Sequence, residues 1–135
     1  MKIIVLQGMP KTGKTTTLNL VYELLVPGGG GISTNRQPLG GDPHDFSDII
    51  LWNGNRIAIF TMGDFSTYLA NAIYEYDRQN CSLVICALST NTPKIRANNA
   101  INQFDSVRIN KTIADDHISE HQANTTDAQT IFNLI

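Results

Sequence analysis

Short apolar runs alternate along this chain with stretches whose apolar residues recur every three to four positions. The run Ile3–Leu6 comes first, and a helical stripe over Thr16–Leu25 follows it. Runs of four to eight apolar residues are typical of strands, whereas longer periodic stretches are typical of amphipathic helices. The alternation predicts an α/β domain with a mostly parallel central sheet.

The rest of the chain continues this pattern. Further strands are predicted at 48–52, 56–61, 82–88 and 106–110, and further helices at 65–78 and 94–104. Asn53-Gly54 is the strongest kind of short hairpin signal, so the strands on either side of it should pair antiparallel. The expected fold is a five-stranded sheet with one antiparallel hairpin and helices on both faces.

Two stretches are harder to interpret. Gly28–Gly31 predicts a mobile connection, because four consecutive glycines are costly to order. The polar segment 32–47 is either a solvated linker or a functional lid. The acidic, histidine-containing stretch 115–124 indicates a loop or a frayed helix, and Thr126-x-x-Gln129 resembles a capping box that would start the last helix.

The amino-acid composition and charge limit the kinds of protein that this chain can be. The 135 residues are 41% hydrophobic and 16% charged, which suits one globular domain spanning 1–135. A formal charge of −2 excludes an overall basic field for nucleic acid, and no clear basic patch or membrane span is visible. Cys81 and Cys86 are expected on opposite faces of one strand, where a mutual disulfide is implausible, so we expect reduced thiols. The apolar run near Met1 is too short for a signal peptide, and the predicted location is therefore the cytoplasm.

The stretch Gly8-Met9-Pro10-Lys11-Thr12-Gly13-Lys14-Thr15 reads G-x-x-x-x-G-K-T directly after the first strand. In such a loop the backbone N–H groups surround a phosphate, and the next helix points its positive end at the same anion. Lys14 is expected as an exposed cation that reaches the β- and γ-phosphates. Thr15 is expected to ligate the Mg²⁺ that bridges them.

These eight residues resemble the Walker A motif of the P-loop NTPases. The resemblance implies a three-layer P-loop domain that binds ATP, or GTP, together with Mg²⁺. The nucleotide contacts that it implies fall on Gly8, Met9, Pro10, Lys11, Thr12, Gly13, Lys14, Thr15 and Thr16.

A second part of the site is expected at Thr61-Met62-Gly63-Asp64, which resembles the Walker B region in place but not in letter. The usual Asp after four apolar residues is replaced by Thr61, and the carboxylate comes three residues later. Asp64 is therefore the candidate metal ligand beside Thr15 and the candidate catalytic residue beside Lys14. The alternative is that Asp64 caps the next helix.

The order of elements also resembles that of the small GTPases. Asn110-Lys111 falls where that family carries the guanine-reading Asn-Lys-x-Asp, but Ile113 stands at the position of the Asp. Without that carboxylate no selectivity for GTP is implied. Lys94, Arg96 and Arg36 are further candidate phosphate cations, or else ordinary surface cations.

Three functions stay open at this point. In the leading one, the protein binds a Mg-nucleoside triphosphate and hydrolyses it slowly, and ATP is the leading candidate for that nucleotide. The second is phosphoryl transfer to an acceptor received by the segment 28–47, as in small-molecule or nucleotide kinases. The third is a non-enzymatic nucleotide-binding module, which the missing Walker B Asp would suit. No protein partner is indicated.

Overall fold

Strands and helices alternate throughout the computed structural model, which describes all residues from Met1 to Ile135. The elements are, in chain order, β1 (Lys2–Gly8), α1 (Lys14–Leu25), β2 (Ile32–Ser33), β3 (Gln37–Pro38), β4 (Phe46–Trp52), β5 (Asn55–Phe60), α2 (Ser66–Arg78), β6 (Leu83–Ser89), α3 (Ile95–Asn102), β7 (Asp105–Asn110) and α4 (Glu120–Asn133). The α/β class predicted from the hydrophobic pattern is confirmed.

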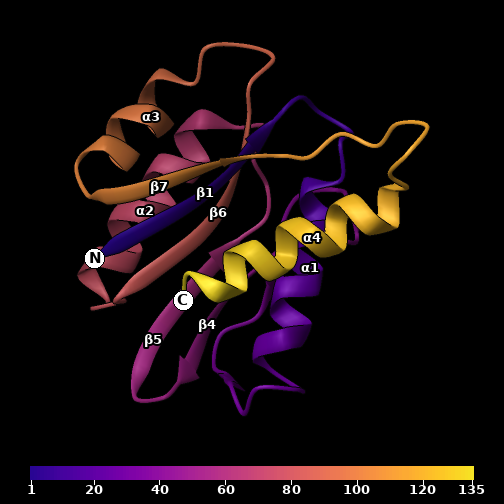
Figure 1. Cartoon of the computed structure of the whole chain (residues 1–135). Helices are drawn as coiled ribbons and strands as arrows, with labels where there is room; N and C mark the ends of the chain where they lie inside the picture. The colour runs from indigo at the N-terminus through magenta and orange to yellow at the C-terminus, as the bar shows by residue number, and fades with distance from the viewer.

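One mixed sheet runs through the molecule in the order β2-β4-β5-β6-β1-β7, with β3 also paired to β4 (Figure 1). Strands β5, β6, β1 and β7 are parallel to one another, whereas β4 pairs antiparallel with β5 across the Asn53-Gly54 turn. The sheet has seven strands and not the five expected. The extra two are β2 and β3, two residues each, which pair with β4 inside a segment that is too polar to read as strand.

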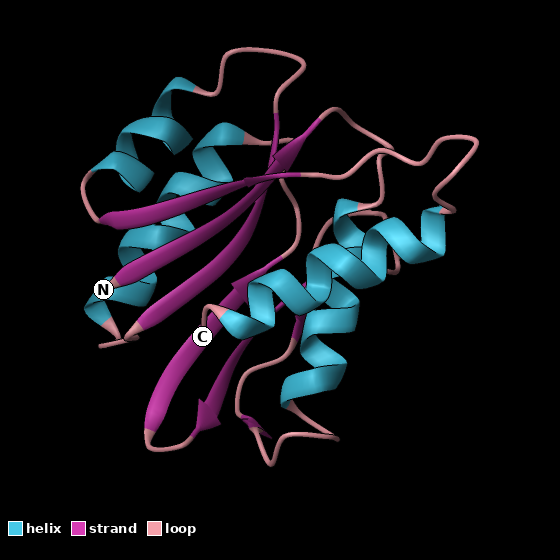
Figure 2. Ribbon diagram, in the orientation of Figure 1, coloured by secondary structure: helices cyan, strands magenta, loops and turns pink.

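Helices cover both faces of the sheet, α1 and α4 on one and α2 and α3 on the other (Figure 2). Strand β1 shows how the core is divided. Its residues Ile3 and Val5 pack on the side of α2 and α3, while Ile4 and Leu6 pack on the side of α1 and α4. Successive strand residues point to opposite faces, so an unbroken apolar run supplies both cores.

The segment between α1 and β4 is folded against its neighbours. Buried Asp48 accepts hydrogen bonds from Tyr22 Oη at 2.8 Å, from Ser33 Oγ at 2.5 Å and from the Asn35 backbone N–H at 2.9 Å. The Arg36 guanidinium lies over the Phe46 ring at 3.9 Å from its centroid. These contacts hold the middle of the segment on α1 and β4.

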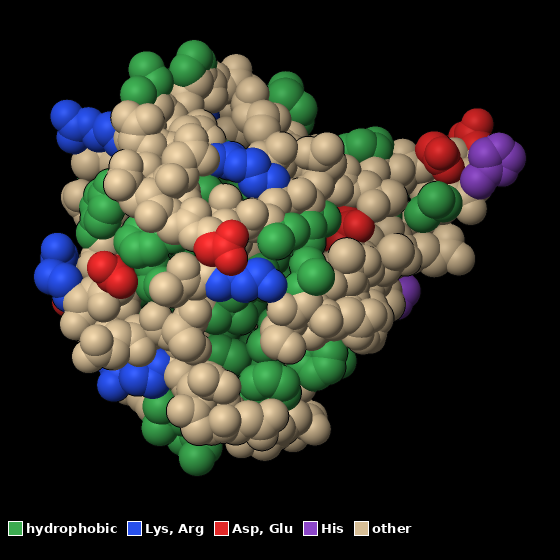
Figure 3. Space-filling view, turned by 60° about the vertical axis from the view of Figure 1, so that its left-hand side comes forward, with side chains coloured by type: hydrophobic (Ala, Val, Ile, Leu, Met, Phe, Trp, Pro, Cys, Tyr) green, Lys and Arg blue, Asp and Glu red, His purple; other side chains and the backbone are tan.

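The last helix starts earlier than the sequence prediction. Its N-cap is Ser119, which forms a capping box with Gln122, whereas Thr126 lies inside the helix. Two Ser/Thr-x-x-Gln patterns occur here, and only the first lies at the start of the helix, with Ser119 as the N-cap and Gln122 in the first turn. The connection from β7 to α4 projects from the body, with acidic and histidine side chains at its tip (Figure 3). No helix is long and apolar enough to cross a membrane.

The two cysteines do not occupy opposite faces of a strand. Cys81 precedes β6 in the turn after α2, and both Cys81 and Cys86 pack into the core on the side of α2 and α3. Both thiols are free and buried. Burial raises the pKa of the Cys86 thiol to about 12, so it stays protonated at neutral pH.

Candidate functional site

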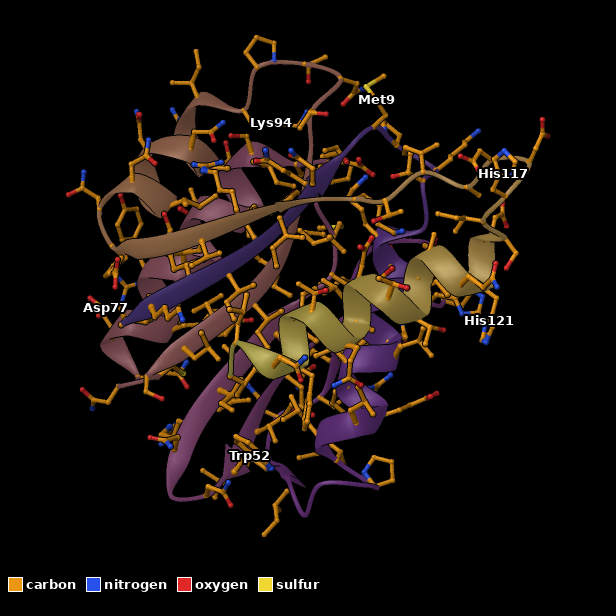
Figure 4. The ribbon with its side chains drawn as sticks, viewed as in Figure 1. Met9, Trp52, Asp77, Lys94, His117 and His121 are labelled. Atoms are coloured by element: carbon orange, nitrogen blue, oxygen red, sulfur yellow. The ribbon has the colours of Figure 1, made fainter.

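A polar cavity of about 510 Å³ opens at the edge of the sheet where β1, β5 and β6 end. The residues that line it are Pro10, Lys11, Thr12, Gly13, Lys14, Thr15, Thr16, Asp42, Asp45, Thr61, Gly63, Asp64, Ser89, Glu120 and Asn124. The carboxyl edge of an open α/β sheet is the usual place for a ligand. Met9 and Lys94 mark this edge, and Asp77 lies at the other end of the molecule (Figure 4).

The loop Gly8–Thr15 joins β1 to α1 and forms one wall of the cavity. Gly13 has φ 96°, and a Cβ there would lie 2.5 Å from Asn124 Oδ1. A larger residue would therefore be strained and would also collide with α4. Helix α1 starts directly after Gly13, and no side chain caps its first N–H groups. The amino end of this helix is thus available to a ligand in the cavity.

Lys14 is buried beneath the loop and not exposed as the sequence suggested. Its ammonium group donates to the carbonyl oxygens of Gly8 at 3.1 Å and Met9 at 2.6 Å. The expectation failed because the side chain folds back under its own loop, where those carbonyls satisfy it. The Lys14 Nζ forms no ion pair with any carboxylate.

Two more buried lysines, Lys94 and Lys111, lie close enough to influence Lys14. Burial lowers the pKa of Lys14; Asp64 acts in the opposite direction, and Lys111 and Lys94 lower it further. Lys94 donates only to Asn91 and Thr92, so its charge has no carboxylate partner either. Lys111, in contrast, is paired with Asp127, so Lys14 and Lys94 are the two lysines here without a carboxylate within ion-pair distance.

The hydroxyl of Thr15, in the first turn of α1, donates a hydrogen bond to a carboxylate that was not among the predicted site residues. Thr15 Oγ1 donates to Asp45 Oδ1 at 3.0 Å, and Thr61 Oγ1 donates to the same oxygen at 2.8 Å. Asp45 lies just before β4. Nothing in its local sequence marks it, because what brings it to the cavity is the pairing of β4 with β5.

Asp64 lies across the cavity and accepts a hydrogen bond from Ser89 Oγ. The N-cap of α2 is Phe65 and has no side-chain hydrogen bond, so the alternative that Asp64 caps this helix is wrong. Gly63 permits the arrangement: a Cβ on Gly63 would lie 2.8 Å from the backbone of Ala87 in β6. This close approach sets Asp64 beside the end of β6.

Asn110 and Lys111 are both engaged within the protein. Asn110 Oδ1 accepts from Gln7 Nε2 at 2.9 Å, and Lys111 Nζ lies 3.0 Å from Asp127 Oδ2. Asp127 also accepts from the backbone N–H and the hydroxyl of Thr112. Both side chains therefore have partners within the protein, and neither residue lines the cavity or the hollow next to it.

The structure brings most of the predicted site residues together. Residues 10–16 and Asp64 line the cavity, while Gly8 and Met9 contribute the carbonyls under the loop. Of the candidate cations, Lys94 is buried at the start of α3, Arg96 is exposed on that helix, and Arg36 stacks on aromatic rings. Five other lining residues were not among the predicted site residues and belong to no recognisable motif: Asp42, Asp45, Ser89, Glu120 and Asn124.

No group of three or more His, Cys, Asp or Glu side chains is arranged to hold a metal ion by itself. The oxygen donors at the cavity are instead single carboxylates and threonine hydroxyls. In comparisons with known proteins, the chain matches no protein-family model, no curated protein and no solved structure.

Proposed function

We propose that this chain binds a magnesium nucleoside triphosphate and hydrolyses it slowly, with ATP as the leading candidate for the nucleotide. The Gly8–Thr15 loop is then a phosphate-binding loop in the three-layer P-loop arrangement, and the phosphates lie between it and the uncapped end of α1. The observation that carries the proposal is Lys14, a buried cation without a carboxylate partner at the wall of a polar cavity. A buried charge of this kind is costly unless an anion completes it.

Binding would exchange the partners of Lys14. In the free protein its ammonium group is held by the Gly8 and Met9 carbonyls, which carry only partial charge. Phosphate oxygens would accept hydrogen bonds from the same ammonium and would add the attraction of a full negative charge, which the carbonyls cannot supply. Mg²⁺ would be held by the Thr15 hydroxyl together with nucleotide oxygens, and when bound it would neutralise charge on the β- and γ-phosphates.

The rest of the nucleotide has room beside the loop. A smaller hollow of about 140 Å³ adjoins the main cavity and shares Lys11, Thr12, Glu120 and Asn124 with it. Ile113, Ala114 and Ala123 give it an apolar wall. This combination suits a ribose or one face of a base, and Ile113 in its apolar wall stands where the guanine-reading Asp would be. ATP and GTP should compete within about tenfold of each other, a difference of ~1.4 kcal/mol.

Hydrolysis, phosphoryl transfer and binding alone are separated by one set of assays. Phosphate release from Mg-ATP without an acceptor supports hydrolysis, whereas a phosphorylated product that forms only with an added acceptor supports a transferase. Binding with neither product supports a non-enzymatic module. The folded segment between α1 and β4 favours hydrolysis over transfer, because Asp48 and the Arg36 stacking hold the middle of the segment that an acceptor would need.

A further inference from the structure

The Asp45 carboxylate accepts hydrogen bonds from two hydroxyl groups that come from different parts of the fold. Thr15 comes from the first turn of α1, and Thr61 follows the end of β5. Both donate to Oδ1 of Asp45, at 3.0 and 2.8 Å. Thr61 is buried, and its Oγ1 in turn accepts from the Phe46 backbone N–H at 2.9 Å. The Thr61 hydroxyl thus accepts one hydrogen bond and donates one, and the donated bond holds the Asp45 carboxylate.

The hairpin explains how Asp45 reaches this place. Ser47 pairs with Phe60, and one step further the Thr61 N–H donates to the Phe46 carbonyl at 3.1 Å. The residue before Phe46 therefore comes beside Thr61 at the cavity. The Asn19 side chain in α1 donates to the backbone carbonyls of Thr15 and His44, at 2.8 and 3.2 Å, and so holds the residues before Asp45 close to α1. The position of the carboxylate is built by β4, β5 and α1 together.

The chemistry of a metal-bound hydroxyl gives this contact a purpose. When a threonine hydroxyl ligates a cation it uses an oxygen lone pair, and its hydrogen stays free to be donated. A carboxylate that accepts the hydrogen orients the hydroxyl and makes its oxygen a better ligand, as outer partners do at metal sites. Asp45 accepts the hydrogen of Thr15, whereas Asp64 is hydrogen-bonded to Ser89.

We propose that Asp45 is the positioning residue for the metal-ligating hydroxyl of Thr15. From its place directly before β4, Asp45 would supply the carboxylate that is absent from position 61 after β5. This inference rests on the proposed nucleotide function. It assigns the metal side of the cavity to Asp45 and leaves Asp64, near Lys14, on the other side.

The negative charge of Asp45 should affect nucleotide affinity in opposite directions with and without Mg²⁺. A carboxylate in the wall of the cavity would repel bound phosphates when no cation lies between them, and would favour their binding when Mg²⁺ does. Asp45→Asn should therefore bind nucleotide without Mg²⁺ as tightly as the wild type or more tightly. The factor by which Mg²⁺ increases the affinity should be about 10–100-fold smaller in this variant than in the wild type, which is the usual effect of losing an outer partner of a metal ligand.

The test is calorimetric titration of the purified chain with a non-hydrolysable ATP analogue, once with Mg²⁺ and once with EDTA. Asp77→Asn is the matched control, because it removes the same charge at the far end of the molecule (Figure 4). In the exchange variant Asp45→Thr/Thr61→Asp the carboxylate moves to the end of β5, and part of the Mg²⁺ effect should return. Circular dichroism checks that each variant is folded.

The outcomes separate the two proposals. A wild type that binds the analogue more tightly with Mg²⁺, and an Asp45→Asn variant that loses this gain but keeps its affinity in EDTA, support the role of Asp45. A folded Asp45→Asn variant with the full Mg²⁺ gain overturns that role and leaves the proposed function standing. A wild type that binds the analogue in neither condition overturns both.

Discussion

The Lys111 ammonium lies 3.0 Å from Asp127 Oδ2, and both side chains are almost completely buried. Asp127 comes from α4, and it also accepts two hydrogen bonds from Thr112. The pair therefore ties the end of β7 to α4, directly behind the Gly8–Thr15 loop: a Cβ on Gly8 would lie 3.0 Å from the Cβ of Lys111.

We expect the Lys111–Asp127 pair to be essential for stability. Asp127→Asn leaves a buried ammonium without its counter-charge, which should lower the free energy of unfolding by about 3–5 kcal/mol. Urea unfolding measures this. The double variant Asp127→Asn/Lys111→Met removes both charges and should regain part of the loss. If Asp127→Asn unfolds at the urea concentration of the wild type, the pair contributes nothing.

Asp64 is expected to affect turnover and not stability. Asp64→Asn keeps an oxygen that can accept from Ser89 but removes the charge facing the cavity. If the carboxylate orients the attacking water, phosphate release should fall by about 10²-fold or more, with little change in melting temperature, because Asp64 does not cap α2.

Ser89→Ala is the matched variant for this prediction. It keeps the Asp64 charge and removes only the hydroxyl that holds it, so its turnover should lie between those of the wild type and Asp64→Asn. Equal turnover in wild type and Asp64→Asn would instead favour the non-enzymatic module.

The stability of the protein should decrease in alkali. Burial raises the pKa of the Cys86 thiol from 9.0 to about 12 and that of the Tyr76 phenol from 10.0 to about 12. Above the unfolded-state pKa only the unfolded form loses these protons, so the free energy of unfolding falls as pH rises toward the folded-state pKa. Each group contributes up to about 1.4 kcal/mol per pH unit in that window.

Urea unfolding at pH values between about 8 and 11 checks this prediction, with the window set by the linkage of proton release to unfolding. Cys86→Val keeps the side chain apolar and removes the thiol, so its stability should fall less steeply with pH than that of the wild type. The difference between the two slopes isolates Cys86 from all other titrating groups. Parallel pH profiles would contradict the prediction.

The sequence predicted the elements of the fold better than the arrangement of the site. The long periodic and apolar runs gave every major strand and helix, and Asn53-Gly54 correctly predicted the hairpin. The short strands β2 and β3 escaped because two-residue pairings leave no periodicity to detect. The start of α4 was misplaced because two similar capping patterns lie within the same polar stretch.

The site was predicted only where a motif concentrates its residues. The Gly8–Thr15 loop is contiguous, so its spacing can be read directly, and residues 10–16 do line the cavity. Asp45 is different, since its contact with Thr15 joins residues 30 positions apart and exists only through the register of β4 on β5. The burial of Lys14 also depends on tertiary structure, because the loop's own carbonyls fold around it.

Lys14 is the residue through which we expect the Gly8–Thr15 loop to bind the phosphates of a nucleotide. Lys14→Met keeps the length of the buried side chain and removes the charge, and Lys14 has no ion pair to lose, so the variant should fold. Lys2→Met is the matched control, because Lys2 starts β1 at the opposite end of the same strand.

Calorimetric titration of wild type, Lys14→Met and Lys2→Met with Mg-ATP is the most direct measurement. Binding to the wild type and to Lys2→Met, with an affinity of Lys14→Met about 10–100-fold weaker, is the predicted result, as expected for the loss of charge-assisted hydrogen bonds. Unchanged affinity in a folded Lys14→Met variant, or no binding by the wild type, would contradict the claim.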